Sequence, residues 1–209
     1  MSIRDIVTHL QRAGIGAMLP GYLPLSAIIP VGDALLAAPV TAVKVQCGPH
    51  SSNIIYDLRH RARENMLVGL GGVKHQWEVD EAITAGAQFV SSDQLQPCLI
   101  NYCQDKDLLF LPMLTQANGA SLPTVAGCEL IGIKATGQAC VDDLFSAVNL
   151  LPNKSIVIVG DITTEAIPLY KQAGAHIIFA GKTLFHSPDQ TMADIITRAR
   201  QLQNMWDKN

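Results

Sequence analysis

The chain has 209 residues, of which 48% are hydrophobic and 16% are charged, and its formal net charge is −3. This length suits one large domain or two small ones. A slightly acidic chain without a basic run does not favour a nucleic acid as a partner. Proline, glycine and aspartate interrupt the most apolar stretch, residues 22–43, so we expect no membrane-spanning helix.

Cysteine and histidine usage also restricts the possibilities. The five cysteines contain no CxxC pair, and the charged N-terminal segment lacks the apolar region of a signal peptide. These features predict reduced thiols and a cytoplasmic protein. The six histidines show no metal-ligand spacing, so we expect no metal site.

Short apolar runs recur along the whole chain and predict eight strands. Nearly continuous apolar runs of this length are typical of parallel strands that are covered on both faces. In chain order, they cover residues 14–21, 42–48, 66–73, 87–92, 108–114, 129–135, 155–161 and 175–181.

Helical patterns lie between these runs. Apolar residues fall on one face in 77–86 and in 141–151, and 163–174 begins with a capping threonine and ends at a glycine. The C-terminal segment 192–209 is also predicted to be a helix. The first connection, 22–39, contains several prolines, which argues against a regular helix there.

Alternating strands and helices predict an α/β fold, and we interpret residues 1–209 as a single (β/α)8 barrel domain. The alternative is an open, doubly wound parallel sheet. The barrel is favoured because eight strands are many for an open sheet in a chain of this length. Neither a GxGxxG motif at the first helix nor a Walker loop is present. The glycines of "GLGGV" (69–73) fit a tight turn as well as a phosphate site.

In such a barrel, the chemistry occurs where the strands end. Lysines are conspicuous among the polar residues at these ends, namely Lys44, Lys134 and Lys182. An unpaired lysine is costly to bury, so Asp93 or Asp161 is expected to partner one of them. Three lysines together suggest an anionic or carbonyl ligand; the alternative is that they only reach solvent at the rim. The other candidates at strand ends are Gly71, Gly72, Ser92, Thr136, Gly160, Asp161 and Gly181.

The order of these elements resembles the 2-keto-3-deoxy-6-phosphogluconate aldolase family, which includes 4-hydroxy-2-oxoglutarate aldolases. The best stretch, residues 66–92, is similar to the family's third strand with its G-x-G-T-V signature and the helix and strand that follow. "FLPML" resembles the family's "PG" strand and adds Pro112 to the candidates. Residues 156–185 resemble the family's phosphate-binding end, and "GIKATG" (132–137) falls where the family carries its Schiff-base lysine.

The resemblance implies a class I aldolase on a (β/α)8 barrel, commonly a homotrimer and without a cofactor. Lys134 would attack the ketone of a 2-keto acid and form an iminium. The substrate would be a 2-keto-3-deoxy or 4-hydroxy-2-oxo acid, with or without a phosphate, and the products pyruvate and an aldehyde. The expected partners are therefore a small 2-keto acid or sugar acid and further copies of the chain.

Several family positions carry other residues in this chain. Lys44 stands where the family has its general acid/base glutamate, Pro20 replaces a carboxylate-binding arginine, and Gly72 replaces the signature threonine. A second ammonium at Lys44 would favour the neutral, nucleophilic form of Lys134.

The backbone near Gly160 and Gly181, together with Lys182, would hold an anionic tail. Asp161 replaces the second phosphate-binding glycine and disfavours a phosphate there.

Two other interpretations of the whole chain are a non-catalytic homologue that binds a small anion and a different phosphate-handling barrel resembling thiamine-phosphate synthase.

Overall fold

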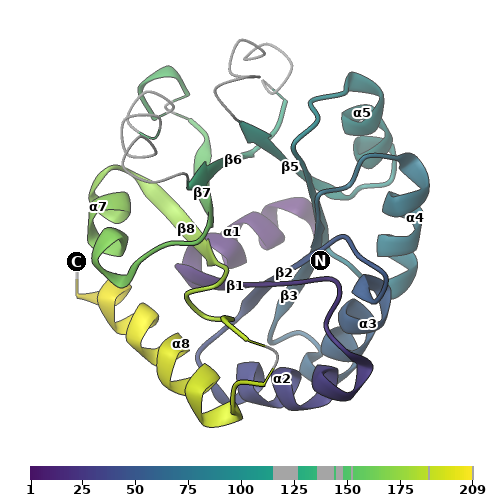
Figure 1. Cartoon of the computed structure of the whole chain (residues 1–209). Helices are drawn as coiled ribbons and strands as arrows, with labels where there is room; N and C mark the ends of the chain where they lie inside the picture. The colour runs from purple at the N-terminus through teal and green to yellow at the C-terminus, as the bar shows by residue number, and fades with distance from the viewer. Residues whose placement is uncertain (115–126, 136–143, 145–147, 152, 188, 209) are drawn as a thin grey trace.

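Eight parallel strands form a closed barrel in the computed structural model (Figure 1). Each strand pairs with the next along the chain, and β8 pairs with β1. The structure describes residues 1–114, 127–135, 144, 148–151, 153–187 and 189–208. The predicted (β/α)8 barrel is therefore confirmed, and the open sheet is excluded because β1 and β8 leave no edge between them.

All eight predicted strands are present, each within its predicted range. This agreement arises because buried parallel strands carry an unusually clear signal, an apolar run bounded by polar residues. The strands are β1 (Ile15–Leu19), β2 (Ala42–Gln46), β3 (Leu67–Gly71), β4 (Phe89–Ser92), β5 (Leu109–Leu114), β6 (Leu130–Ala135), β7 (Ser155–Gly160) and β8 (Ala175–Ala180).

Helices surround the barrel, and none of those in the described residues is long and apolar enough to cross a bilayer. The helix expected over 77–86 is confirmed as α4, with Glu78 in its first turn as part of a capping box. Of the helix expected over 141–151, residues 141–143 and 145–147 lie outside the described part. The helical elements are α1 (Ile3–Ala13), α2 (Leu25–Ala37), α3 (Ser51–Ala62), α4 (Gln76–Ala85), α5 (Pro97–Asp105), η2 (Thr164–Ala166), α7 (Ile167–Gln172) and α8 (Met192–Asp207).

The expectation that the proline-containing first connection forms no regular helix is wrong, because this segment forms helix α2. Pro24 takes the N-cap position, where a missing amide hydrogen costs no intrahelical bond, and Pro30 lies inside the helix. The helix persists because it buries Ile28, Val31 and Leu35 against the barrel. Tertiary packing therefore outweighs the local cost of a proline.

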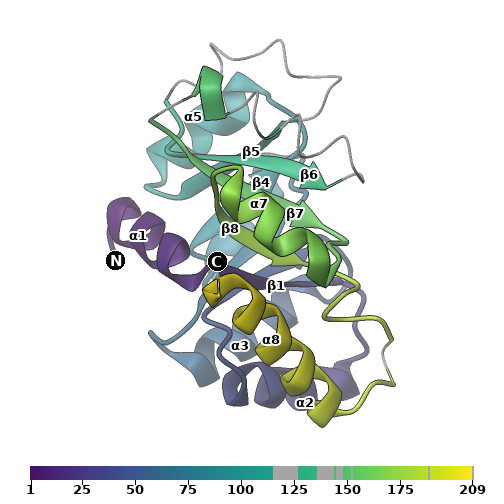
Figure 2. The same ribbon diagram turned by 90° about the vertical axis from the view of Figure 1, so that its left-hand side faces the viewer.

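One end of the barrel is sealed by α1. Its Leu10 and neighbouring apolar side chains pack against the inward-facing residues of the strands. Figure 2 shows this helix across the end where the strands begin, with the strand arrowheads pointing away from it. Phe89 and Phe179 fill the centre, with ring centroids 5.8 Å apart. The interior is thus closed at the bottom and apolar in the middle, which leaves the opposite end as the mouth.

Glycines on the strands make room for these central rings. A Cβ atom on Gly69 would lie 2.5 Å from three atoms of the Phe89 ring, which is fully buried. We expect Gly69→Ala to lower the free energy of unfolding by about 1–3 kcal/mol, as overpacking of a core does. Gly127→Ala is the control, because its nearest neighbour is 3.5 Å from the added atom and the site is exposed. Equal midpoints for the two variants in urea denaturation would contradict this account of the barrel centre.

Candidate active site

Two lysines point into the mouth of the barrel from different strands. Side chains alternate along a strand, so Lys44 lies on the same face of β2 as the interior residue Ala42. On β6, Lys134 similarly shares the face of the interior residue Leu130. The structure therefore brings together the two lysines that sequence reasoning named as catalytic.

Lys134 forms an ion pair with Asp93, which directly follows β4. The Lys134 side chain keeps 44% of its surface exposed and the Asp93 side chain 46%, so solutes can reach the pair. Because both ends of the pair are open to solvent, its contribution to stability is small. The pair instead brings an amine and a carboxylate together at the mouth.

Lys44 lies deeper in the barrel, with 3% of its surface exposed. The pKa of Lys44 is lowered to about 8, mainly by burial; the charge of Asp93 opposes this shift, and the charge of Lys134 adds to it. Gly71 on β3 provides the space, since a Cβ there would collide with Cε of Lys44. The predicted candidate Gly71 therefore acts by admitting the Lys44 side chain.

Ser91 is a candidate that sequence reasoning did not select. It is fully buried, shares the inward face of β4 with Phe89, and its hydroxyl has no hydrogen-bond partner among the described residues. A buried hydroxyl without a partner is costly, so such a group is a natural contact for a ligand. The two-residue period from Phe89 through Ser91 to Asp93 was the signal that could have identified both polar residues.

Neighbouring Ser92 has a different position. Its hydroxyl donates to the Val73 carbonyl oxygen at 2.5 Å and accepts from the Gln94 amide at 3.0 Å. Gly72, which has a φ of 86°, donates its amide hydrogen to the Ser91 carbonyl oxygen at 2.8 Å. These bonds join the ends of β3 and β4 and hold the backbone next to Asp93 in place.

Two further predicted site residues are Pro112 on β5 and Thr136 after β6. Pro112 pairs with Ser92 and alternates with the interior residues Leu111 and Met113, so it faces away from the barrel interior. Thr136 lies outside the described residues.

The ends of β7 and β8 hold the third predicted lysine. Asp161 accepts the Lys182 backbone amide hydrogen at 2.9 Å, and its second oxygen lies 3.3 Å from Lys182 Nζ. Gly181 donates its amide hydrogen to the Gly160 carbonyl oxygen at 2.9 Å. The predicted residues Gly160, Asp161, Gly181 and Lys182 are therefore adjacent. Lys182 is paired with the Asp161 carboxylate and not with a group beside Lys134.

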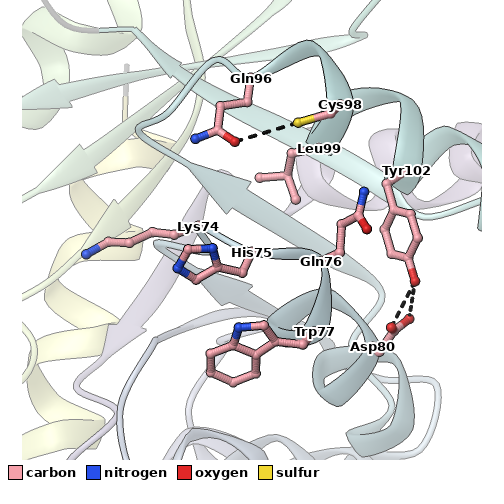
Figure 3. A pocket seen from close by; sticks show the side chains of 9 residues that line it. All are labelled: Lys74, His75, Gln76, Trp77, Asp80, Gln96, Cys98, Leu99 and Tyr102. Atoms are coloured by element: carbon pink, nitrogen blue, oxygen red, sulfur yellow. Dashed lines mark hydrogen bonds between the residues drawn. The ribbon is translucent and has the colours of Figure 1, made fainter.

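A pocket of about 550 Å³ lies between the starts of α4 and α5 (Figure 3). The rings of His75 and Trp77 stack there, and Tyr102 donates its hydroxyl hydrogen to Asp80 at 2.8 Å. Neither Lys44 nor Lys134 lines it, so it is separate from the mouth. In the parts of the chain that the structure describes, no three histidine, cysteine or acidic side chains gather closely enough to hold a metal ion.

Known structures share this architecture. The chain has a TM-score of 0.82 and 20% identity with the 2-keto-3-deoxy-6-phosphogluconate aldolase of Zymomonas mobilis ZM4 with 3-phosphoglycerate, over 96% of each chain. The KDPG aldolase of Legionella pneumophila, with pyruvate captured as a covalent carbinolamine, has a TM-score of 0.75 and 15% identity over 95% of each chain. Thiamine phosphate pyrophosphorylase from Pyrococcus furiosus has a TM-score of 0.72 and 14% identity, over 96% of this chain and 98% of that one. At these identities the likeness shows the fold alone.

The family is shown by a comparison of sequences. A search among curated proteins finds no significant match. The family model described as KDPG and KHG aldolase, however, matches residues 23–198. This range runs from the start of α2 into α8 and includes the Lys134–Asp93 pair and Lys44. The chain therefore belongs to the KDPG and KHG aldolase family.

Proposed function

We propose that the protein is a class I aldolase that cleaves a 2-keto-3-deoxy or 4-hydroxy-2-oxo acid to pyruvate and an aldehyde. The observation that carries this proposal is the exposed Lys134 amine, which faces into the barrel mouth beside Asp93 in a member of this family. The Legionella pneumophila relative, whose structure holds pyruvate as a covalent carbinolamine, supports the same type of intermediate here.

The reaction would begin when the neutral Lys134 amine attacks the substrate's C2 carbonyl. Loss of water from the carbinolamine gives an iminium, which withdraws electrons from the neighbouring bonds. Removal of the C4 hydroxyl proton then breaks the C3–C4 bond and releases the aldehyde. The bonding electrons form an enamine of pyruvate; protonation at C3 and hydrolysis release pyruvate and restore the amine.

Asp93 is the carboxylate best placed to accept that proton. The family's glutamate position is occupied by Lys44 on β2, but Asp93 reaches Lys134 from the end of β4. The iminium keeps the positive charge of the lysine, so the carboxylate would stabilise it as well. Lys44, buried in the same mouth, would add a positive charge that attracts the carboxylate of the substrate.

The direct test is to trap the intermediate. The protein is incubated with pyruvate and borohydride, which reduces an imine to a stable secondary amine, and the intact mass is measured. We expect one pyruvate adduct per chain, mapped by peptide digestion to Lys134. A protein that forms no adduct but is still stabilised against heat by a small anion would instead support a non-catalytic homologue. Tight phosphate binding without an adduct would support a phosphate-handling barrel of another kind.

Replacement of Asp93 separates proton transfer from imine formation. We expect Asp93→Asn to lower kcat for aldol cleavage by about 10²–10⁴-fold, the usual contribution of a general base. The variant should still form the borohydride-trapped pyruvate adduct, because that step needs the amine and not the C4 proton acceptor. Asp107→Asn is the control, since Asp107 follows α5 on the exposed surface. Unchanged turnover in Asp93→Asn would remove Asp93 from the mechanism.

A further inference from the structure

The ends of β7 and β8 offer the donors that sequence reasoning assigned to an anionic tail of the substrate. Those donors are the Lys182 backbone amide and the Lys182 ammonium, beside Gly160 and Gly181. In the structure, both interact with the carboxylate of Asp161, at 2.9 Å from the amide nitrogen and 3.3 Å from Nζ. The chain therefore supplies its own anion to these groups.

The carboxylate also fills the space in which an anion would lie. A Cβ atom on Gly181 would be 2.8 Å from Asp161 Oδ1, so the absence of a side chain at Gly181 leaves room that Asp161 occupies. A phosphate brought to this position would lose its donors to Asp161 and would face a like charge at close range. Neutral hydroxyl groups would not meet this repulsion.

We propose that Asp161 is a specificity residue that closes this anion subsite, so that the substrate is a 2-keto-3-deoxy sugar acid without a phosphate. This proposal rests on the proposed aldolase function. The Asp161 side chain keeps 49% of its surface exposed. A carboxylate has about four acceptor positions, and the contacts with Lys182 leave some of them available to the hydroxyl hydrogens of a substrate tail.

Phosphate binding tests the closed subsite without any need for turnover. Inorganic phosphate is titrated into the whole protein by calorimetry, for the wild type, Asp161→Gly and Asp161→Asn. We expect Asp161→Gly, which frees both the donors and the space, to bind phosphate at least about tenfold more tightly than the wild type. Asp161→Asn removes the charge but keeps the bulk, so it should gain less. Glu165→Gln, which removes a nearby exposed charge without touching Lys182, should bind like the wild type.

Two results would overturn the proposal: wild-type protein that binds phosphate as tightly as Asp161→Gly, or neither Asp161 variant gaining affinity. Circular dichroism shows that each variant is folded; if Asp161→Gly is not, Asp161→Asn decides the question. A second measurement compares kcat/KM for a 2-keto-3-deoxy sugar acid with and without a terminal phosphate. The wild type should prefer the unphosphorylated acid, and this preference should fall at least about tenfold in Asp161→Gly. Absence of all turnover would contradict the aldolase function but leave the phosphate titration decisive for Asp161.

Discussion

Lys134→Ala is expected to abolish the pyruvate adduct that borohydride traps and to lower kcat by about 10³-fold or more. The physical reason is that removal of a covalent nucleophile eliminates the intermediate through which the reaction proceeds. Intact-mass measurement after reduction gives the adduct, and a coupled assay of pyruvate release gives kcat. The side chain is about half exposed at the mouth, so the substitution should leave the fold intact.

Lys134→Arg is the sharper variant, because a guanidinium keeps the positive charge and can still pair with Asp93 but forms no imine. It should lose the adduct as completely as the alanine variant. Lys106→Met, at the exposed end of α5, should keep both adduct and turnover. An adduct that persists in Lys134→Arg and maps to Lys44 would place the nucleophile on β2. In that case Lys134 and Asp93 would be a charged pair near the nucleophile Lys44.

Lys44→Met is expected to raise the free energy of unfolding at pH 7 by as much as roughly 3 kcal/mol. Burial lowers the pKa of Lys44 from 10.5 to about 8. A difference of that size between the unfolded and folded chain corresponds to about 1.4 kcal/mol per unit. Methionine fills a similar volume without a charge to desolvate, and its exchange for a buried charge commonly stabilises a fold. Denaturation with urea measures the difference.

The pH dependence of this difference provides the decisive readout. Below pH 8, Lys44 is charged in both the folded and the unfolded chain, and the full cost of burying the charge applies. Between pH 8 and 10.5 the unfolded chain binds more protons at this residue, so the Lys44 contribution to stability rises with pH. The advantage of Lys44→Met should therefore shrink across this window and vanish near pH 10.5.

Comparison between variants isolates Lys44 from other groups that titrate in the same range. Burial raises the pKa of Cys47 to about 11, above this window, and both proteins contain this thiol, so its titration contributes little to the difference. Lys106→Met should show no comparable gain at any pH, because Lys106 is 46% exposed. A Lys44→Met variant less stable than the wild type at pH 7 would mean that contacts in the barrel interior offset the cost of burying the Lys44 ammonium.

If Lys44 assists Lys134, the same variant should also trap pyruvate more slowly at pH 7. One positive charge fewer at the mouth weakens the attraction for the carboxylate of pyruvate. Greater stability together with slower trapping would identify Lys44 as a residue kept for function at a cost in stability. Faster trapping in Lys44→Met would exclude this role.

Sequence alone was sufficient for the strands because each is an apolar run whose signal is local. Eight such runs in 209 residues also favoured closure into a barrel. The same local reasoning failed at α2, where prolines argued against a helix. There, burial of Ile28, Val31 and Leu35 against the barrel decides the conformation, and the core residues that they contact come from distant parts of the sequence.

The site divides in a similar way. Lys44 and Lys134 were identified from their places at strand ends, because the topology of a barrel gathers those ends at one mouth. Which carboxylate meets which lysine was beyond the sequence, since Asp93 and Lys134 are 41 residues apart and Asp161 and Lys182 are 21 apart. Those pairings depend on how neighbouring strands are staggered around the barrel.

The amino-acid sequence by itself therefore determined the alternation of strands and helices and the places of the lysines at strand ends. Each of these depends on hydrophobic patterning along a few residues. Only the tertiary structure decided that Lys44 is buried, that Asp93 lies beside Lys134 and that Asp161 occupies the donors at Lys182. Burial and charge pairing are properties of groups that the fold brings together from distant parts of the chain, and no local pattern records them.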